Sequence, residues 1–231
     1  MPARNTIKKY IENSYYHIYN RGVEKRTIFE DSQDYAVFLS YLKNYLMPKD
    51  INYLQKQLSE STDYARKDKI LKLIRLNNFA DEIKLMAYCL MPNHFHLIVK
   101  QSSANSIDNF INSLNTRYVM YFNKKNKRVG PLFQGVYKAV LIESDEQLIQ
   151  LSAYIHRNPE KLSLKRKRNT IDSLLKQPSS LSDYLGITHT SWVDTKVIES
   201  FFSKTNIKTS YKKFVMHSAQ PHISIADLTI E

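Results

Sequence analysis

Residues 91–100 read MPNHFHLIVK, and this stretch decides how the rest of the chain is arranged. Its bulky, β-forming residues predict a strand, in which successive side chains point to opposite faces of a sheet. His94 and His96 therefore share one face, whereas Phe95 and Leu97 share the other. We expect the apolar side chains to pack into a core, while the opposite face presents two imidazoles side by side.

Two histidines at this spacing suit a divalent metal, because neutral imidazole is a common ligand and a strand fixes the direction of both side chains. A single histidine in such a strand would more often be a half-buried structural residue. With two on one face, after a Pro-Asn turn, the stretch alone supports the structural and the metal-binding interpretations about equally. A third ligand and a reacting group must come from elsewhere in the chain.

The composition is that of a basic globular protein. The 231 residues are 42% hydrophobic, which is enough for a core in one domain with an appendage. Lys and Arg total 34 against 22 Asp and Glu, so the formal net charge is +12 and the surface attracts polyanions. Nucleic acid is therefore the first partner to consider.

Other features of the composition exclude several classes of protein. No apolar run approaches the length of a membrane span, and the N-terminal MPARNTIKKY lacks the apolar centre of a signal peptide, so we expect a cytoplasmic protein with no membrane partner. The single cysteine, Cys89, excludes an internal disulfide and a multi-cysteine zinc site. It lies in an apolar run, which predicts a small core residue.

Hydrophobic periodicity predicts the order strand, helix, strand, strand, helix, strand, followed by one further helix. Residues 91–93 turn the second strand directly into the histidine strand, which makes an antiparallel hairpin. The predicted ranges are 15–20, 83–90, 94–100 and 133–142 for the strands, and 31–47, 107–123 and 144–158 for the helices.

This order is that of a ferredoxin-like α+β fold, a four-stranded antiparallel sheet with helices on one face. The other face is open for the last helix to cross. Ser144, with Gln147 three residues later, has a capping-box signature at the start of that helix. Pro159 disfavours helical geometry before it, so the helix should end near Asn158.

Two regions fall outside this arrangement. Residues 49–80 are polar and charged, and they predict a helical insertion of two short helices. Residues 166–231 begin with a basic run and continue with short helical patterns around 181–185, 197–203 and 211–216, which we interpret as a linker and an accessory C-terminal helical region. The rest, residues 1–165, is predicted to be one catalytic domain.

The last helix supplies what the histidine face lacks. Tyr154 and Asn158 are four residues apart, so their side chains lie on one face of the helix. Asn158 can provide a hard oxygen ligand that completes His94 and His96, which with water gives an open site for Mg²⁺ or Mn²⁺. A phenol needs such a metal to act as a nucleophile at neutral pH. From the helix alone, Tyr154 could instead pack while Asn158 ends the helix.

Taken together, these segments resemble the single-tyrosine HUH transposases, and within them the REP-associated tyrosine transposases. The resemblance covers nearly the whole chain. Its main segments are YHIYNRG at 16–22, MPNHFHLIV at 91–99, GPLFQGVYKAVLI at 130–142 and YIHRNP at 154–159, with weaker matches at 180–186, 192–194 and 211–215.

The resemblance implies that His94 and His96 are metal ligands, that Asn158 is the third, at a position whose residue type varies in the family, and that Tyr154 is the nucleophile. It implies an enzyme: a metal-dependent single-stranded DNA endonuclease and strand transferase, a transposase acting on hairpin or REP-type repeats through a covalent 5'-phosphotyrosine. No nucleotide cofactor is expected, since the chain has no GxxxxGK loop. Monomer and homodimer both stay open.

Basic side chains near the edges of the expected site are candidate DNA contacts, with aromatic side chains stacking on unpaired bases. Any one charge run is more often solvated surface. The candidates are Arg21, Lys124, Lys125, Lys127, Arg128, Lys138, Arg157, Lys165, Arg166, Lys167 and Arg168.

Two other functions stay open. One is a hairpin-binding protein, derived from a transposase, that does not cleave. The other is a metal phosphodiesterase that uses water as the nucleophile, in which Tyr154 only positions the substrate. His17 is interpreted as a structural residue or a DNA contact, and the next candidate nucleophiles after Tyr154 are Tyr118, Tyr121 and Tyr137.

Overall fold

A computed structural model describes residues 10–159, 170–203, 205–206 and 209–217 of the chain. Its four strands form one antiparallel sheet in the order β2-β3-β1-β4. The strands are β1 (Tyr15–Arg21), β2 (Ile83–Met91), β3 (His94–Gln101) and β4 (Lys138–Ile142). The predicted ferredoxin-like α+β fold is confirmed.

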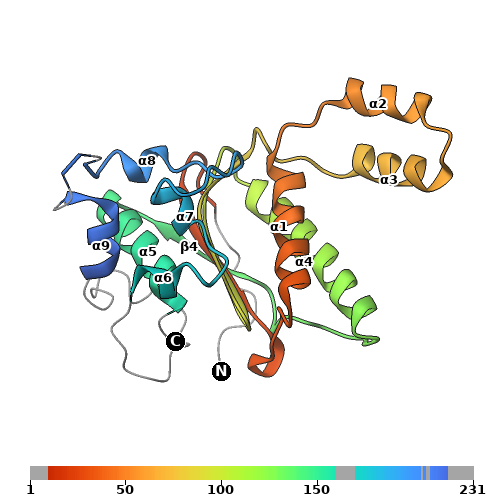
Figure 1. The fold of residues 1–231 in the computed structure, drawn as a ribbon. Coiled ribbons are helices and arrows are strands. Elements are labelled where there is room, and N and C mark those ends of the chain that lie inside the picture. The colour runs from red at the N-terminus through yellow and green to blue at the C-terminus, as the bar shows by residue number, and fades with distance from the viewer. Residues whose placement is uncertain (1–9, 160–169, 204, 207–208, 218–231) are drawn as a thin grey trace.

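Helices cover both faces of the sheet (Figure 1). On one face lie α1 (Ser32–Leu46) and α4 (Ser106–Lys125), and on the other lies α5 (Asp145–Arg157). Each face has its own cluster of buried apolar side chains. The helix that carries the proposed tyrosine therefore crosses the face that the sequence left open.

Local signals place the ends of these helices. Asp31 begins α1, because its carboxylate accepts a hydrogen bond from the backbone N–H of Asp34. Ser144 begins α5 in the same way and accepts from the backbone N–H of Gln147. The Gln147 side chain in turn accepts from the backbone N–H of Glu143, which completes a reciprocal cap close to the predicted one.

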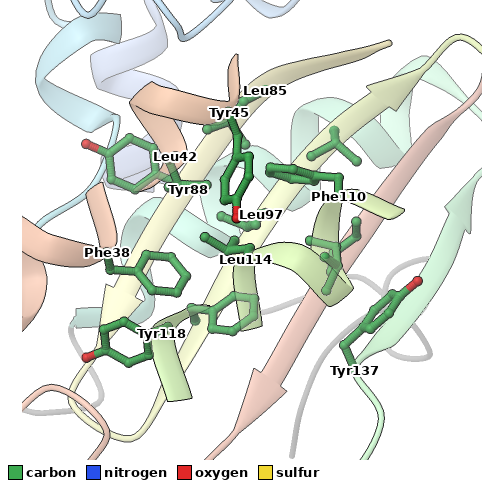
Figure 2. Close-up of a cluster of buried hydrophobic side chains, with 14 of the residues drawn as sticks. Phe38, Leu42, Tyr45, Leu85, Tyr88, Leu97, Phe110, Leu114, Tyr118 and Tyr137 are labelled. Carbon is green, nitrogen blue, oxygen red and sulfur yellow. The ribbon is translucent and has the colours of Figure 1, made fainter. Parts of the chain in front are cut away.

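The core between the sheet and the α1–α4 layer fixes which way β3 faces. Phe95 and Leu97 are fully buried there, and the Phe95 ring packs 5.3 Å from that of Phe38, centroid to centroid. Figure 2 shows this cluster, with Leu97 near its centre beside Tyr45 and Leu114. Since these side chains point into this core, the alternate residues of β3 point toward α5.

The strand register brings further residues to the α5 face. His96 is the direct partner of Tyr19 on β1 and of Cys89 on β2. His94 pairs with Arg21 of β1 in the same way. Because directly paired residues point to the same face, β1 contributes its own side chains to the face that carries the two histidines.

The fourth strand is shorter than predicted. The pattern of residues 133–142 predicts a strand throughout, but β4 begins only at Lys138. Phe133 makes an isolated bridge with Gly22, and the buried Tyr137 donates a hydrogen bond to Asp108 of α4. These contacts draw the preceding segment into the α4-side core, so it does not continue the ladder.

Residues 49–80 contain the predicted pair of helices, α2 (Ile51–Glu60) and α3 (Tyr64–Arg75). Asp50 and Asp63 cap their starts. The two helices pack against each other and project from the body beside α1 (Figure 1).

The described helices of the C-terminal region lie on the α5 side of the sheet (Figure 1). Its short helices are α6 (Ile171–Leu174), α7 (Leu181–Tyr184), α8 (Lys196–Glu199) and α9 (Tyr211–His217). The last three were predicted and α6 was not. A short 3-10 helix, η1 (Val23–Lys25), follows β1.

Cys89 is fully buried, as predicted, and burial raises the pKa of its thiol. In the described part of the chain, no helix has both the length and the apolar character that crossing a membrane requires.

Candidate active site

The four residues singled out in the sequence come together between β3 and the end of α5. The side-chain amide of Asn158 lies between the two imidazoles. Its Oδ1 is 3.4 Å from His94 Nε2, and its Nδ2 is 3.2 Å from His96 Nε2. The backbone of Asn158 is still helical, so its side chain stays on the face of α5 that carries Tyr154.

Tyr154 lies against the same histidine pair. Its ring meets that of His96 edge to face, at 6.1 Å between centroids and 85° between planes. The rings of His94 and His96 are themselves perpendicular, with centroids 4.9 Å apart. Tyr154 is half-buried, whereas its neighbours Ala153 and Ile155 are buried, so Tyr154 keeps some exposure to solvent.

The residue before β3 fixes the proton on His94. The Asn93 amide nitrogen donates to the backbone carbonyl of Lys25, which turns Asn93 Oδ1 toward His94 Nδ1, 2.6 Å away. An amide oxygen only accepts, so His94 Nδ1 must carry the proton in this bond. The Nε2 of a neutral His94 then presents its lone pair toward Asn158.

This arrangement fits a divalent cation. In a neutral His94 that is protonated at Nδ1, the lone pair of Nε2 and the Asn158 Oδ1 are two acceptors that face each other, and a positive ion between them would be stabilised. Among the described residues, no three His, Cys, Asp or Glu side chains form a metal-binding group. A set of three protein ligands therefore needs a donor of another type, and the Asn158 amide oxygen is of the hard type that Mg²⁺ and Mn²⁺ prefer.

A chain of buried hydrogen bonds holds α5 in place from behind. The Tyr88 N–H of β2 donates to Ser180 Oγ, whose hydroxyl contacts His156 Nε2 at 2.8 Å. His156 Nδ1 lies 2.7 Å from the Tyr211 hydroxyl, which donates to Ser152 Oγ. A neutral His156 that accepts at Nε2 and donates at Nδ1 satisfies every step. The C-terminal region thereby anchors the tyrosine helix to the sheet.

The sequence reasoning missed Tyr19. Its ring lies 6.1 Å from that of His96 and 4.9 Å from that of His17. Burial, followed by the nearby Tyr154, raises the pKa of the Tyr19 phenol, while Arg21 opposes this shift. The alternation of YHIYNRG already puts Tyr19 on one face with His17, but only the register of β1 against β3 shows that this face is the site.

The other tyrosines named as possible nucleophiles are remote from this face. Tyr118 and Tyr137 are buried in the α1–α4 side core, where Tyr118 donates to the Ile28 carbonyl. Tyr121 donates to the buried carboxylate of Asp34. Tyr19 is therefore the second phenol of the site.

The candidate DNA contacts divide between the two sides of the sheet. Arg21 and the exposed Lys138 lie on the site face, as the partners of His94 and Tyr19, and Arg157 is the last residue of α5. The others described belong to the end of α4 or the loop after it, on the far layer (Figure 1). Lys165, Arg166, Lys167 and Arg168 lie outside the described residues.

Two of the α4-end cations have protein partners. Lys125 forms ion pairs with Asp31 at 2.8 Å and Asp34 at 2.6 Å. Arg128 donates to the Asn123 side chain and the Pro131 carbonyl. Lys124 and Lys127 are exposed.

Comparison with known proteins agrees with this geometry over part of the chain. Residues 55–158 match the family model for IS200-like transposases. No curated protein matches the chain in sequence. The matched region contains His94, His96, Tyr154 and Asn158.

Two solved structures are similar at low identity. The REP-associated tyrosine transposase bound to a REP hairpin is 12% identical, with 83% of this chain and 98% of that one covered and a TM-score of 0.47. A candidate transposase from Deinococcus radiodurans is 16% identical, with 67% and 97% covered and a TM-score of 0.27. Over residues 55–158, less than half of its length, the chain is similar to the IS200-like transposases, and this match supports a transposase-type function that acts on DNA.

Proposed function

We propose that this chain is a metal-dependent endonuclease and strand transferase of single-stranded DNA. It acts on hairpin-forming, REP-type repeats through a covalent 5'-phosphotyrosine. The observation that carries the proposal is the meeting of Tyr154 with an imidazole pair whose Nε2 atoms both face the Asn158 amide. That is a nucleophile beside a set of nitrogen and oxygen donors suited to a divalent cation.

His94, His96 and Asn158 would hold Mg²⁺ or Mn²⁺ in this proposal. When bound, the cation neutralises charge on the scissile phosphate and so favours attack by a phenol. Asn93 keeps the His94 Nε2 lone pair directed into the site. The hydrogen-bond chain through His156 keeps α5, and with it Tyr154, against the sheet.

The reaction at phosphorus is a transesterification. Tyr154 Oη attacks the phosphorus and loses its proton, and the bond from phosphorus to the 3'-oxygen breaks. The 3'-oxygen leaves with the bonding electrons, takes up a proton and becomes a 3'-hydroxyl. The 5'-phosphate stays on the tyrosine. Attack by another 3'-hydroxyl reverses these steps and joins two strands, with no water consumed.

We propose that residues 1–165, including the helical insertion at 49–80, form the catalytic domain, and that residues 166–231 are accessory. The buried bonds of His156 to Ser180 and Tyr211 support a role for the accessory region in holding the tyrosine helix. Arg21, Lys138 and Arg157 are the proposed DNA contacts nearest the site.

A covalent adduct tests the proposed function. End-labelled hairpin DNA with a single-stranded flank, such as a REP hairpin, is incubated with the protein and Mn²⁺ or Mg²⁺ and then denatured. We expect a protein-linked labelled product, absent after chelation of the metal and absent in Tyr154→Phe. Tyr19→Phe is the matched control, since it removes the second phenol of the site, and its adduct should still map to Tyr154.

The outcomes separate three functions. Cleaved DNA without an adduct would favour a phosphodiesterase that uses water. Hairpin binding without cleavage, over a range of hairpins, would favour a binding protein. An adduct that survives in Tyr154→Phe and disappears in Tyr19→Phe would reassign the nucleophile.

A further inference from the structure

We propose that His17 is a positioning residue for the metal ligand His96. In this proposal His17 accepts a hydrogen bond from His96 Nδ1 and thereby keeps the lone pair of His96 Nε2 directed at the metal position. The inference rests on the proposed metal site and extends it to a residue of β1 that contacts His96.

The contact between the two imidazoles is a hydrogen bond in the plane of the rings. His17 Nε2 lies 2.9 Å from His96 Nδ1. The ring planes are within 16° of each other and the centroids are 5.1 Å apart. Nitrogens this close cannot belong to rings stacked face to face, so the imidazoles lie edge to edge in nearly one plane, as an N–H···N bond requires.

Two arrangements of protons could make this bond between neutral imidazoles. If His96 Nδ1 donates, His96 Nε2 has a lone pair, and that lone pair can accept from Asn158 Nδ2 or bind a metal. If His17 Nε2 donates instead, the proton of His96 moves to its Nε2. That N–H would then face the N–H of Asn158 at 3.2 Å, donor against donor. The observed contacts favour the first arrangement.

Burial strengthens the hydrogen bond between His17 and His96. His17 and His96 are both 0% exposed, so bulk water does not compete for this bond. The two proposed histidine ligands are then oriented in the same way. The Nδ1 of His94 is hydrogen-bonded to Asn93, and the Nδ1 of His96 is hydrogen-bonded to His17. In both histidines the Nε2 faces Asn158. Groups that orient metal-binding histidines in this way tune the affinity of the metal.

Two substitutions separate positioning from packing. His17→Phe retains a planar ring of similar size but removes the acceptor nitrogen. His17→Gln retains an acceptor, its side-chain oxygen, and should restore part of the effect. Circular dichroism and thermal unfolding of each variant establish that it is folded.

Two measurements without DNA report on His96 itself. Nitrogen-15 NMR of the histidine rings in the metal-free protein distinguishes a proton on Nδ1 from one on Nε2. A Mn²⁺ titration followed by electron paramagnetic resonance gives the metal affinity. We expect His96 to carry its proton on Nδ1 in the wild type and to lose this preference in His17→Phe. The Mn²⁺ affinity of that variant should fall by about 10- to 100-fold.

The proposal is overturned if the wild type carries the His96 proton on Nε2, a result that needs no variant. It is also overturned if folded His17→Phe binds Mn²⁺ as tightly as the wild type. The adduct assay on wild type tests the proposed function separately. If the wild type forms the adduct but His17→Phe binds Mn²⁺ as tightly as the wild type, this inference alone is rejected. If the tautomer and the Mn²⁺ affinity change as expected but the wild type forms no adduct, the proposed function alone is rejected.

Discussion

The imidazole of His156 and the hydroxyl of Tyr211 lie 2.7 Å apart and are both buried, although 55 positions separate them in the chain. His156 is two residues beyond Tyr154 on α5, and Tyr211 is the first residue of α9. The accessory region thus contacts the tyrosine helix directly, through a polar bond inside an apolar cluster.

Tyr211→Phe should therefore destabilise the protein. The change removes the hydroxyl that links His156 to Ser152 and leaves a buried nitrogen and a buried hydroxyl without that partner. We expect the free energy of unfolding to fall by about 1–3 kcal/mol, measured by urea denaturation. Tyr64→Phe, at a side chain 87% exposed, is the matched control and should change it by less than about 0.5 kcal/mol. Equal effects of the two changes would contradict a special role for the bond.

Acid should weaken the same contact. Burial lowers the pKa of His156 to about 3, from an ordinary value of 6.5. Between these values the unfolded chain binds a proton at His156 and the folded chain does not. The free energy of unfolding should thus fall as the pH falls from 6.5 toward 3, by up to about 1.4 kcal/mol per pH unit from this group.

The comparison of wild type with His156→Gln isolates that contribution, because the other titrating groups are common to both proteins. Urea denaturation is measured at intervals of about one pH unit between pH 7 and pH 4. As the pH falls, the free energy of unfolding should decrease more steeply for the wild type than for the variant. If the two proteins lost stability in parallel, burial would not lower the pKa of His156 in the folded protein.

The metal-ligand assignment of Asn158 makes its own prediction. Asn158→Ala removes the oxygen that faces His94 Nε2 and should weaken Mn²⁺ binding by at least about tenfold. Asn158→Asp keeps an oxygen donor and adds negative charge, so it should bind Mn²⁺ at least as well as the wild type. Asn109→Ala, at an exposed position of α4, should leave the affinity unchanged. An unchanged affinity in Asn158→Ala would remove this residue from the ligand set.

Much of the fold and part of the site follow from short-range patterns. The alternation around His94 and His96 predicts both the strand and its two faces, because the period of a strand is local. The spacing of Tyr154 and Asn158 likewise predicts a shared helix face. Phe95 then orients β3, and a register slip of one residue would turn the histidines into the apolar core.

What the sequence did not reveal depends on contacts between distant segments. The roles of His17 and Tyr19 require the pairing of β1 with β3, which no local period specifies. The hydrogen bonds of His156 require the C-terminal region to fold back on α5. The prediction of a strand from residue 133 was wrong for the same reason. The sequence does alternate there, but Tyr137 is buried in the core and donates a hydrogen bond to α4, so the strand begins only after it.

The two lysines Lys138 and Lys125 give the last prediction, because both were candidates for DNA contact and the structure puts them in different surroundings. Lys138 is exposed on the site face, paired with Tyr19. Lys125 is paired with Asp31 and with the fully buried Asp34. Replacing each by alanine should therefore affect different properties.

Lys138→Ala should weaken binding of a single-stranded oligonucleotide and lower the slope of log affinity against log salt by about 0.7, the share of one phosphate contact. Its melting temperature should be that of the wild type. Lys125→Ala should instead lower the melting temperature, because it leaves the Asp34 carboxylate buried without its cation, and should keep the wild-type salt slope. Fluorescence anisotropy at several salt concentrations and thermal unfolding measure both properties for both variants. If the two changes reduced the salt slope equally, the surface at the end of α4 would have to be included among the DNA contacts.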